Sequence, residues 1–407
     1  GTGLSGGAMP IKDSIVLGLS KLTKVISINP QEQTAIVEPG VRNIAISEAA
    51  DEYGLYYAPD PSSQIACTIG GNVAENAGGV HCLKYGLTVQ NIESIKIMTI
   101  DGDELVFSRN DDGLGLLALM TGSEGLLGII TEITVKLTKK PEVAKLVMAG
   151  FDSVRDCADS VAGIIRHGII PAGLEMMDEF AIQASEEFAK PGYPLGSKAL
   201  LLCELDGSEE SVIPDVDTVV SLLSKASSIR VSKSEEERLL LWKGRKAAFP
   251  AVGRISPDYY CMDGTIPKRH LADVLEKINA LSKHYSLRVA NVFHAGDGNL
   301  HPLILYDAGV PGELEKTEEF GNEILKLCIE VGGSITGEHG VGVEKLDAMC
   351  FQYSDAELDV FHQIKAAFDP QSLLNPGKAV PSLHRCAELG NMHVHHGNLP
   401  HPELERF

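Results

Sequence analysis

The chain has 407 residues, a formal net charge of −21 and 44% hydrophobic residues. That length predicts two or three domains, and that apolar fraction predicts a substantial core. The acidic balance argues against nucleic acid and against an anionic membrane surface as partners, because both demand a basic face. No apolar run approaches the roughly 18 residues that a membrane-spanning helix needs, so we expect no direct membrane insertion.

The first 140 residues alternate strand-like runs, glycine-rich turns and a helix. Because Gly1 falls inside a glycine-rich motif, we expect the native N-terminus to lie upstream and this domain to be truncated here. Hydrophobic periodicity and turn signals define its elements. We predict, in chain order, a strand over 34–41, a helix over 43–53 that stops at Gly54, a hairpin of strands 92–99 and 104–107, and a strand over 128–137.

Residues 141–380 differ in character, since strand candidates there alternate with amphipathic helices. This order indicates an α+β domain in which helices cover an antiparallel sheet. Residues 381–407 form a tail with five histidines and three prolines. The eight cysteines form no CxxC pair, which favours free thiols in a reducing compartment, and hence the cytoplasm. We predict strands over 144–150 and 199–204, and helices over 157–167, 212–224 and 234–249.

Three glycine-rich clusters mark the first domain. The cluster at 1–7, GTGLSGG, contains G-x-G-x-x-G, but no strand precedes it and no carboxylate follows about 20 positions on. We therefore reject a nicotinamide-binding Rossmann turn. The other clusters span 59–79 and 122–131. Glycines let a backbone approach a ligand closely and present consecutive N–H groups to an anion. Three such loops indicate a long ligand that carries a diphosphate.

The loop sequences GTGLSGG, PDPSSQIACTIGGNVAENAGG and GSEGLLGIITEITV resemble those of the FAD-binding fold shared by vanillyl-alcohol oxidase relatives. Members that attach FAD covalently use a histidine near the first loop, whereas the first histidine here is His81, so the resemblance implies non-covalent FAD. It assigns the cofactor contacts to Gly1, Thr2, Gly3, Leu4, Ser5, Gly6, Gly7, Pro59, Asp60, Ser62, Gly70, Gly71, Asn72, Asn76, Gly79, Gly122, Ser123, Glu124, Gly125, Gly128, Ile129, Ile130 and Asn375.

The segment NVFHAGDGNLH places His294 and His301 between two strand-like runs. Along one unbroken strand, a separation of seven residues would put the two imidazoles on opposite faces. The Gly-Asp-Gly-Asn insert breaks the strand and allows both rings to converge. The alternative is a hairpin with two incidental histidines.

The segment GGSITGEHGVG is predicted to be a short strand that opens into Glu338 and His339. Two histidines and one carboxylate, His294, His301 and Glu338, form the donor set of a catalytic zinc site, which Mn(II) or Fe(II) would also tolerate. His339 would then remain free as a base. Its alternative role is a fourth ligand or a buried structural histidine.

These two segments resemble the C-terminal half of the FAD-linked D-2-hydroxy acid dehydrogenases and oxidases. The resemblance implies an α+β chain, with a vanillyl-alcohol oxidase-type FAD-binding domain over 1–140 and an antiparallel-sheet-plus-helices substrate (cap) domain over 141–380. It also implies a divalent metal on His294, His301 and Glu338, and His339 as the base that takes the hydroxyl proton.

Arg245 corresponds to the arginine that binds the substrate carboxylate in this family. The alternative is that Lys243, Arg245 and Lys246 form a solvated charged face. Relatives that accept dicarboxylates carry polar groups where this chain has apolar residues, which points to a small monocarboxylate. These positions are Phe249, Cys261 and Leu303.

The resemblance therefore implies oxidation of a small 2-hydroxy acid, glycolate or D-lactate, to the 2-oxo acid. The tail is similar to that of the catalytic flavin subunits in the glycolate-oxidising branch, which implies an iron–sulfur subunit and a second flavin-fold subunit as partners. Such an assembly would be cytoplasmic or peripheral at the inner membrane, and a metal-binding tail is the alternative. The rival interpretations are a stand-alone D-lactate dehydrogenase with a quinone or cytochrome acceptor, a non-catalytic scaffold subunit, and a flavin-dependent transferase.

Overall fold

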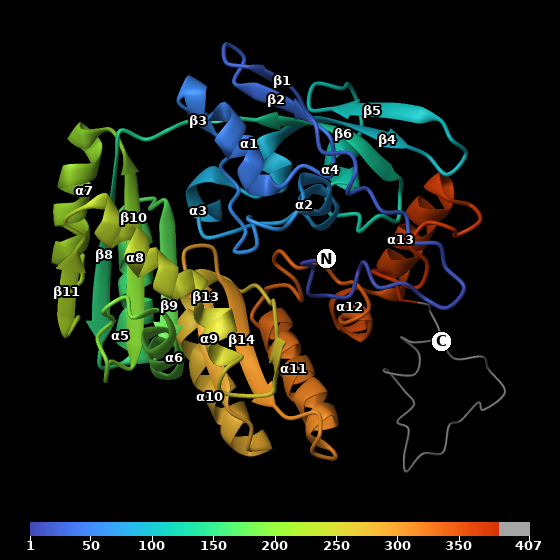
Figure 1. Cartoon of the computed structure of the whole chain (residues 1–407). Coiled ribbons are helices and arrows are strands. Elements are labelled where there is room, and N and C mark those ends of the chain that lie inside the picture. The colour runs from blue at the N-terminus through green and yellow to red at the C-terminus, as the bar shows by residue number, and fades with distance from the viewer. Residues whose placement is uncertain (382–407) are drawn as a thin grey trace.

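Two antiparallel sheets organise residues 1–381, the part of the chain that this computed structural model describes (Figure 1). The smaller sheet has five strands in the order β1-β2-β6-β4-β5. They are β1 (Val25–Asn29), β2 (Thr34–Val37), β6 (Ile129–Lys136), β4 (Ile92–Met98) and β5 (Glu104–Ser108). A separate two-stranded sheet joins β3 (Leu55–Tyr56) to β7 (Thr138–Lys139).

Short helices pack against the five-stranded sheet and complete a first core. Ile95 and Ile133 from the strands are buried together with Ile46 of α1 and Val73 of α2. The helical elements of this part are α1 (Asn43–Ala50), η1 (Asp51–Tyr53), α2 (Ile69–Glu75), α3 (Cys82–Tyr85), η2 (Thr88–Asn91) and α4 (Leu116–Met120).

The larger sheet has seven antiparallel strands in the order β11-β8-β10-β9-β13-β14-β12. Its strands are β11 (Ser228–Val231), β8 (Val143–Phe151), β10 (Ala199–Gly207), β9 (Gly173–Asp178), β13 (Val289–His294), β14 (Asn299–Tyr306) and β12 (Asp258–Cys261). The helices that accompany it are α5 (Val154–Arg166), α6 (Glu179–Ala189), α7 (Glu209–Leu222), α8 (Glu235–Lys246), α9 (Ala248–Val252), η3 (Lys268–His270), α10 (Leu271–Tyr285) and α11 (Glu313–Glu330).

Helices cover both faces of this sheet. In β10, Leu201 and Cys203 face a core shared with α5, α7, α10 and α11, whereas Leu200 and Leu202 face a core shared with α6, α8 and α9. Successive side chains of a strand point to opposite faces, so a strand that is buried on both sides is apolar at every position. This explains the unbroken run ALLLC in the sequence.

The chain then returns to the first core. Leu346 and Met349 of α12 (Leu346–Gln352) pack into the core that the larger sheet shares with α5, α7, α10 and α11. Ile364 and Phe368 of α13 (Asp355–Phe368) pack against the first core. In Figure 1, α13 lies below the right-hand end of the smaller sheet. Residues far apart in sequence therefore meet between the two sheets.

The structure confirms all but one of the predicted elements and shifts some of their boundaries. Strand β2 ends at Val37 because Pro39 and Gly40 form a turn, and the helix predicted over 234–249 divides at Ala247 into α8 and α9. The short strand predicted before Glu338 is wrong: only Ser334 pairs, in an isolated bridge to Thr265. Gly54, at which the helix was predicted to stop, has a φ of 67° and ends η1.

Two expectations from composition can also be compared with the structure. Among residues 1–381, no helix combines the length and apolar character that crossing a bilayer requires. Six cysteines of this region are free thiols, as expected, whereas Cys350 is disulfide-bonded.

Candidate active site

The turn between β13 and β14 brings His294 and His301 to one face of the larger sheet. His294 pairs with Asn299, and His301 pairs with Val292 two residues further along the ladder. Directly opposed residues of an antiparallel pair share a face, so both imidazoles point the same way. Their ring centroids lie 5.0 Å apart with an interplanar angle of 89°. The predicted convergence across the broken strand is confirmed.

Glu338 completes a donor set with these histidines. Its Oε1 lies 3.0 Å from His301 Nε2 and 3.4 Å from His294 Nε2. Burial alone would raise the pKa of Glu338, but the two imidazoles hold it well below its usual range, so the carboxyl group is ionised as a ligand must be. One ligand atom from each residue lies within 4.8 Å of the others. The three residues fit a divalent cation.

A second set, Cys261, His301 and His339, meets the same distance limit but not the geometry. The rings of His301 and His339 are stacked, with centroids 4.8 Å apart and an interplanar angle of 9°. An imidazole nitrogen binds a metal in the plane of its ring, and two nearly parallel planes share no such point. The perpendicular rings of His294 and His301 do share one, which favours the set with Glu338.

His339 lies beside this set without belonging to it. Its Nε2 is 3.9 Å from Glu338 Oε1. Burial lowers the pKa of His339 to about 4, so its imidazole is neutral near pH 7. A neutral imidazole is the form that accepts a proton.

Asp263 holds the loop that carries Glu338 and His339. This carboxylate is fully buried and accepts hydrogen bonds from the backbone N–H groups of Gly337, Glu338 and His339 at 2.9–3.2 Å. The ammonium group of Lys345 lies 3.1 Å from Asp263 Oδ2 and compensates its charge. Sequence reasoning missed Asp263, although an aspartate next to glycine in the apolar run CMDG was a signal.

Glu175 on β9 was also missed, and it supports His294 from the other side. Its Oε1 lies 2.8 Å from His294 Nδ1, which therefore donates, and its Oε2 lies 2.6 Å from Arg245 Nη2. Arg245 is 1% exposed, and its Nε and Nη2 make no aligned hydrogen bond. The structure thus places Arg245 next to Glu175 and not beside the three candidate metal ligands, and the Nε of Arg245 has no hydrogen-bond partner. The sequence signal was a charged residue within the apolar strand GLEMM.

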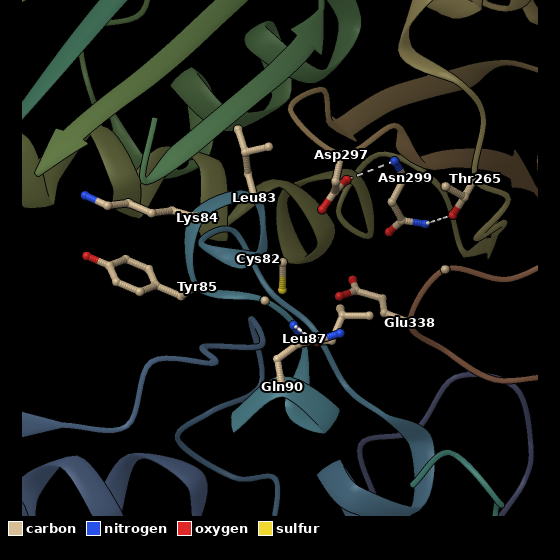
Figure 2. Close-up of a pocket in the computed structure, with 12 residues that line it drawn as sticks. Cys82, Leu83, Lys84, Tyr85, Leu87, Gln90, Thr265, Asp297, Asn299 and Glu338 are labelled. Atoms are coloured by element: carbon tan, nitrogen blue, oxygen red, sulfur yellow. Dashed lines mark hydrogen bonds between the residues drawn. The ribbon is translucent and has the colours of Figure 1, made fainter. Parts of the chain in front are cut away.

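A cavity of about 500 Å³ opens between the two halves of the molecule and reaches Glu338. Figure 2 shows residues Cys82–Gln90 of the first part on one side and Thr265, Asp297 and Asn299 of the second on the other, with Glu338 between them. The carboxylate of the donor set therefore lines an open space between the domains.

The first and third glycine-rich loops meet at Asn375. The side-chain amide of Asn375 donates to the carbonyl oxygens of Gly7 at 2.9 Å and of Glu124 at 2.7 Å. The Glu124 carboxylate accepts from the backbone N–H groups of Val341 and Gly342, each at 2.7 Å. The predicted cofactor loops therefore contact the segment that follows His339.

Other residues that were predicted to contact the cofactor make contacts with other residues of the chain. Asn72 contacts Asn43 and Cys67, and Asn76 accepts from the Val89 N–H. Asp60 pairs with His81 and Lys246. Gly70, Gly79 and Gly128 each lie where a β-carbon would come within 2.7 Å of a neighbouring atom. The remaining predicted contacts are exposed at Gly1, Thr2, Gly3, Leu4, Ser62, Gly71 and Gly122, half-buried at Gly6, Ser123, Gly125 and Ile129, and buried at Ser5, Gly7, Pro59 and Ile130.

Family comparisons agree with this arrangement. Residues 1–108 match the family described as FAD binding domain, and residues 140–379 match the C-terminal domain of FAD linked oxidases. The chain belongs to the FAD-linked oxidases and binds FAD. The buried, unpartnered Ser5 Oγ and Glu75 Oε2 beside the glycine-rich loops fit a ligand rich in hydrogen-bonding groups.

Within this family, the chain is 60% identical over 412 residues to the glycolate oxidase subunit GlcD of Escherichia coli, an alignment that covers 100% of this chain and 83% of that protein. It is 38% identical to the GlcD subunit of Bacillus subtilis, covering 93% of this chain and 82% of that one. A D-lactate dehydrogenase of Anaerostipes hadrus is 31% identical, over 93% of this chain and 82% of that protein.

Solved structures define the fold. A 4-ethylphenol oxidase from Gulosibacter chungangensis aligns with a TM-score of 0.74 at 16% identity, covering 94% of this chain and 84% of that one. A p-cresol methylhydroxylase aligns with a TM-score of 0.73 at 17% identity, covering 90% and 79%. The predicted vanillyl-alcohol oxidase-type fold is confirmed.

Proposed function

We propose that this chain oxidises glycolate, with D-lactate as a further substrate, to the corresponding 2-oxo acid. The observation that carries the proposal is the cluster of His294, His301 and Glu338 with His339 alongside, at a cavity between an FAD-binding part and a substrate part. The names of the relatives, glycolate oxidase subunit and D-lactate dehydrogenase, agree with it.

Two cofactors, FAD and a divalent metal, would supply the redox and Lewis-acid chemistry. FAD, bound without a covalent bond, supplies the two-electron acceptor. His294, His301 and Glu338 would hold a divalent metal, zinc first and Mn(II) or Fe(II) as alternatives, which supplies a Lewis acid for the substrate oxygen.

The remaining residues bind the substrate and move its proton. We assign the substrate carboxylate to Arg245, because its Nη2 is already 2.6 Å from Glu175 Oε2 but its buried Nε has no hydrogen-bond partner. His339 takes the hydroxyl proton at Nε2, the nitrogen that lies 3.9 Å from Glu338 Oε1. The buried ring environment keeps His339 neutral until that transfer.

Three apolar residues next to His301 support a small substrate. Phe249 packs its ring edge against His301 at 6.2 Å between centroids, and Cys261 pairs with Leu303 in the β12–β14 ladder. Leu303 is fully buried and Cys261 is 8% exposed. A second carboxylate placed against these side chains would lose its hydration without gaining a partner.

Anaerobic bleaching of the flavin absorbance tests the substrate assignment directly. We expect glycolate and D-lactate to reduce the bound flavin, and D-2-hydroxyglutarate to leave it oxidised. L-lactate controls for stereochemistry. Reduction by the dicarboxylate alone, or by none of these acids, would contradict the proposal.

We further propose that the chain works with an iron–sulfur subunit and a second flavin-fold subunit, in the cytoplasm or peripherally at the inner membrane. The relatives named as subunits support an assembly with other chains. The histidine-rich tail, for which docking to a partner was predicted, lies beyond residue 381 and outside the described residues. The relatives named D-lactate dehydrogenase support a stand-alone enzyme instead, which predicts full quinone reduction by the purified chain without partners.

A further inference from the structure

Glu75 ends α2, and its carboxyl group lies where the first glycine-rich loop meets the segment after His339. A β-carbon on Gly7 would lie 3.1 Å from Glu75 Oε1, and one on Gly340 would lie 2.4 Å from Glu75 Oε2. Glu75 Oε2 is buried and has no hydrogen-bond partner. Ser5 Oγ, 3.8 Å from the same Gly7 position, is also buried and unpartnered. Two buried polar groups without hydrogen-bond partners therefore lie next to the first of the predicted FAD-binding loops.

A second carboxyl group occupies the same small space. Glu124 Oε2 lies 3.4 Å from the β-carbon position of the same loop glycine, and Glu124 Oε1 lies 2.8 Å from that of Gly340. Glu124 accepts two backbone N–H groups, and such bonds stabilise its ionised form. Two adjacent buried carboxyl groups do not both ionise, so the proton remains on Glu75.

The charged groups around Glu75 agree with a proton on its carboxyl group. Burial and the negative charge of Glu124 raise the pKa of Glu75 to about 8. The Lys345 ammonium opposes this rise, and the Asp263 carboxylate adds to it. Burial raises the pKa of Glu124 as well, and its two backbone hydrogen bonds and the Lys345 and Lys378 ammonium groups oppose that rise.

We propose that Glu75 is a neutral carboxylic acid whose hydroxyl donates a hydrogen bond to an oxygen of bound FAD. The phosphate, ribityl and ring-carbonyl oxygens of FAD are acceptors, and a second carboxylate at this position would repel the diphosphate. Ser5 supplies a further donor from the first loop. The inference rests on FAD binding and is independent of which hydroxy acid is oxidised.

The test measures the dissociation constant of FAD from pH 6 to 10. FAD is removed from the protein and titrated back, with flavin fluorescence as the signal. In the unmodified protein we expect the dissociation constant to rise above pH about 8, approaching about tenfold per pH unit. Glu75→Gln, which keeps a donor but cannot ionise, is expected to bind FAD with little dependence on pH.

Two further variants complete the test. Glu75→Ala removes the donor and is expected to weaken FAD binding by about tenfold at pH 7. Glu104→Gln, on an exposed edge strand, is the matched control and is expected to behave like the unmodified protein. Circular dichroism checks that each variant is folded. The proposal is overturned if Glu75→Gln keeps the pH dependence, or if it binds FAD as weakly as Glu75→Ala at pH 7. Failure to oxidise glycolate would leave this result unaffected.

Discussion

Glu175 fixes the ring of His294, because its Oε1 lies 2.8 Å from His294 Nδ1 while Nε2 faces Glu338. Because Nδ1 donates to Glu175, the neutral form of His294 carries its lone pair on Nε2, which is the form that a metal ligand needs. Arg245 holds the second oxygen of the same carboxylate. The orientation of one histidine is therefore set by a residue 119 positions away in the sequence.

Replacing Glu175 by Gln should weaken metal binding by about 10–100-fold, the usual effect of losing the group that orients a histidine ligand. The measurement is a metal titration of the chelator-treated protein with elemental analysis of the bound fraction. Glu142→Gln, on the exposed start of the substrate part, is the control. Unchanged affinity in the Glu175 variant would mean that the metal does not use His294.

Replacing His339 by Ala should slow reduction of the flavin by about 10²–10⁴-fold, the usual contribution of a general base. The measurement is anaerobic stopped-flow absorbance with saturating glycolate. His284→Ala, on the exposed surface of α10, should reduce its flavin at the normal rate. An equal rate in the His339 variant would remove this residue from the mechanism.

Replacing Asp263 by Ala should lower the free energy of unfolding by about 3–5 kcal/mol, because Lys345 would be left buried without its partner. The loop with Glu338 would also lose its three backbone contacts. Urea unfolding followed by circular dichroism measures the change, with the exposed Asp112→Ala as control. A loss below about 1 kcal/mol, the range of surface pairs, would contradict the assigned role.

Much of this arrangement follows from local sequence signals, and the exceptions have physical causes. The histidine pair was predictable because strand, turn and strand are adjacent in the chain. Asp263 and Glu175 were not, since their contacts depend on which strands become neighbours and in which register. The wrong strand before Glu338 shows the same limit: Ile335 is buried like a strand residue, but only Ser334 finds a pairing partner.

Stability at alkaline pH should depend on His81, which joins the two parts of the molecule. Its ring lies 3.0 Å from Asp60 of the first part and 3.0 Å from Glu204 of the second. Burial alone would lower the pKa of His81, but these carboxylates raise it to about 10. A raised pKa stabilises the fold fully below about 6.5, the value in an unfolded chain, and the stabilisation is lost as pH rises through about 10.

We therefore expect the melting temperature of the unmodified protein to fall between pH 7 and 10 more steeply than that of a His81→Gln variant. Thermal unfolding at several pH values measures the difference, and His284→Gln controls for loss of a histidine. Parallel curves for the unmodified and His81→Gln proteins would show that the ion pairs do not link the two parts.

The hydrogen bonds from the Val341 and Gly342 N–H groups to Glu124 connect the FAD-binding part to the loop that carries the proposed metal ligand Glu338. Glu124 belongs to a loop of the FAD-binding part, and its bonds order the stretch that starts with Glu338 and His339. A cofactor that orders one end of this connection reduces the entropy lost when an ion orders the other. Such linkage is reciprocal, so FAD would tighten binding of the proposed metal by the same factor by which the metal would tighten binding of FAD.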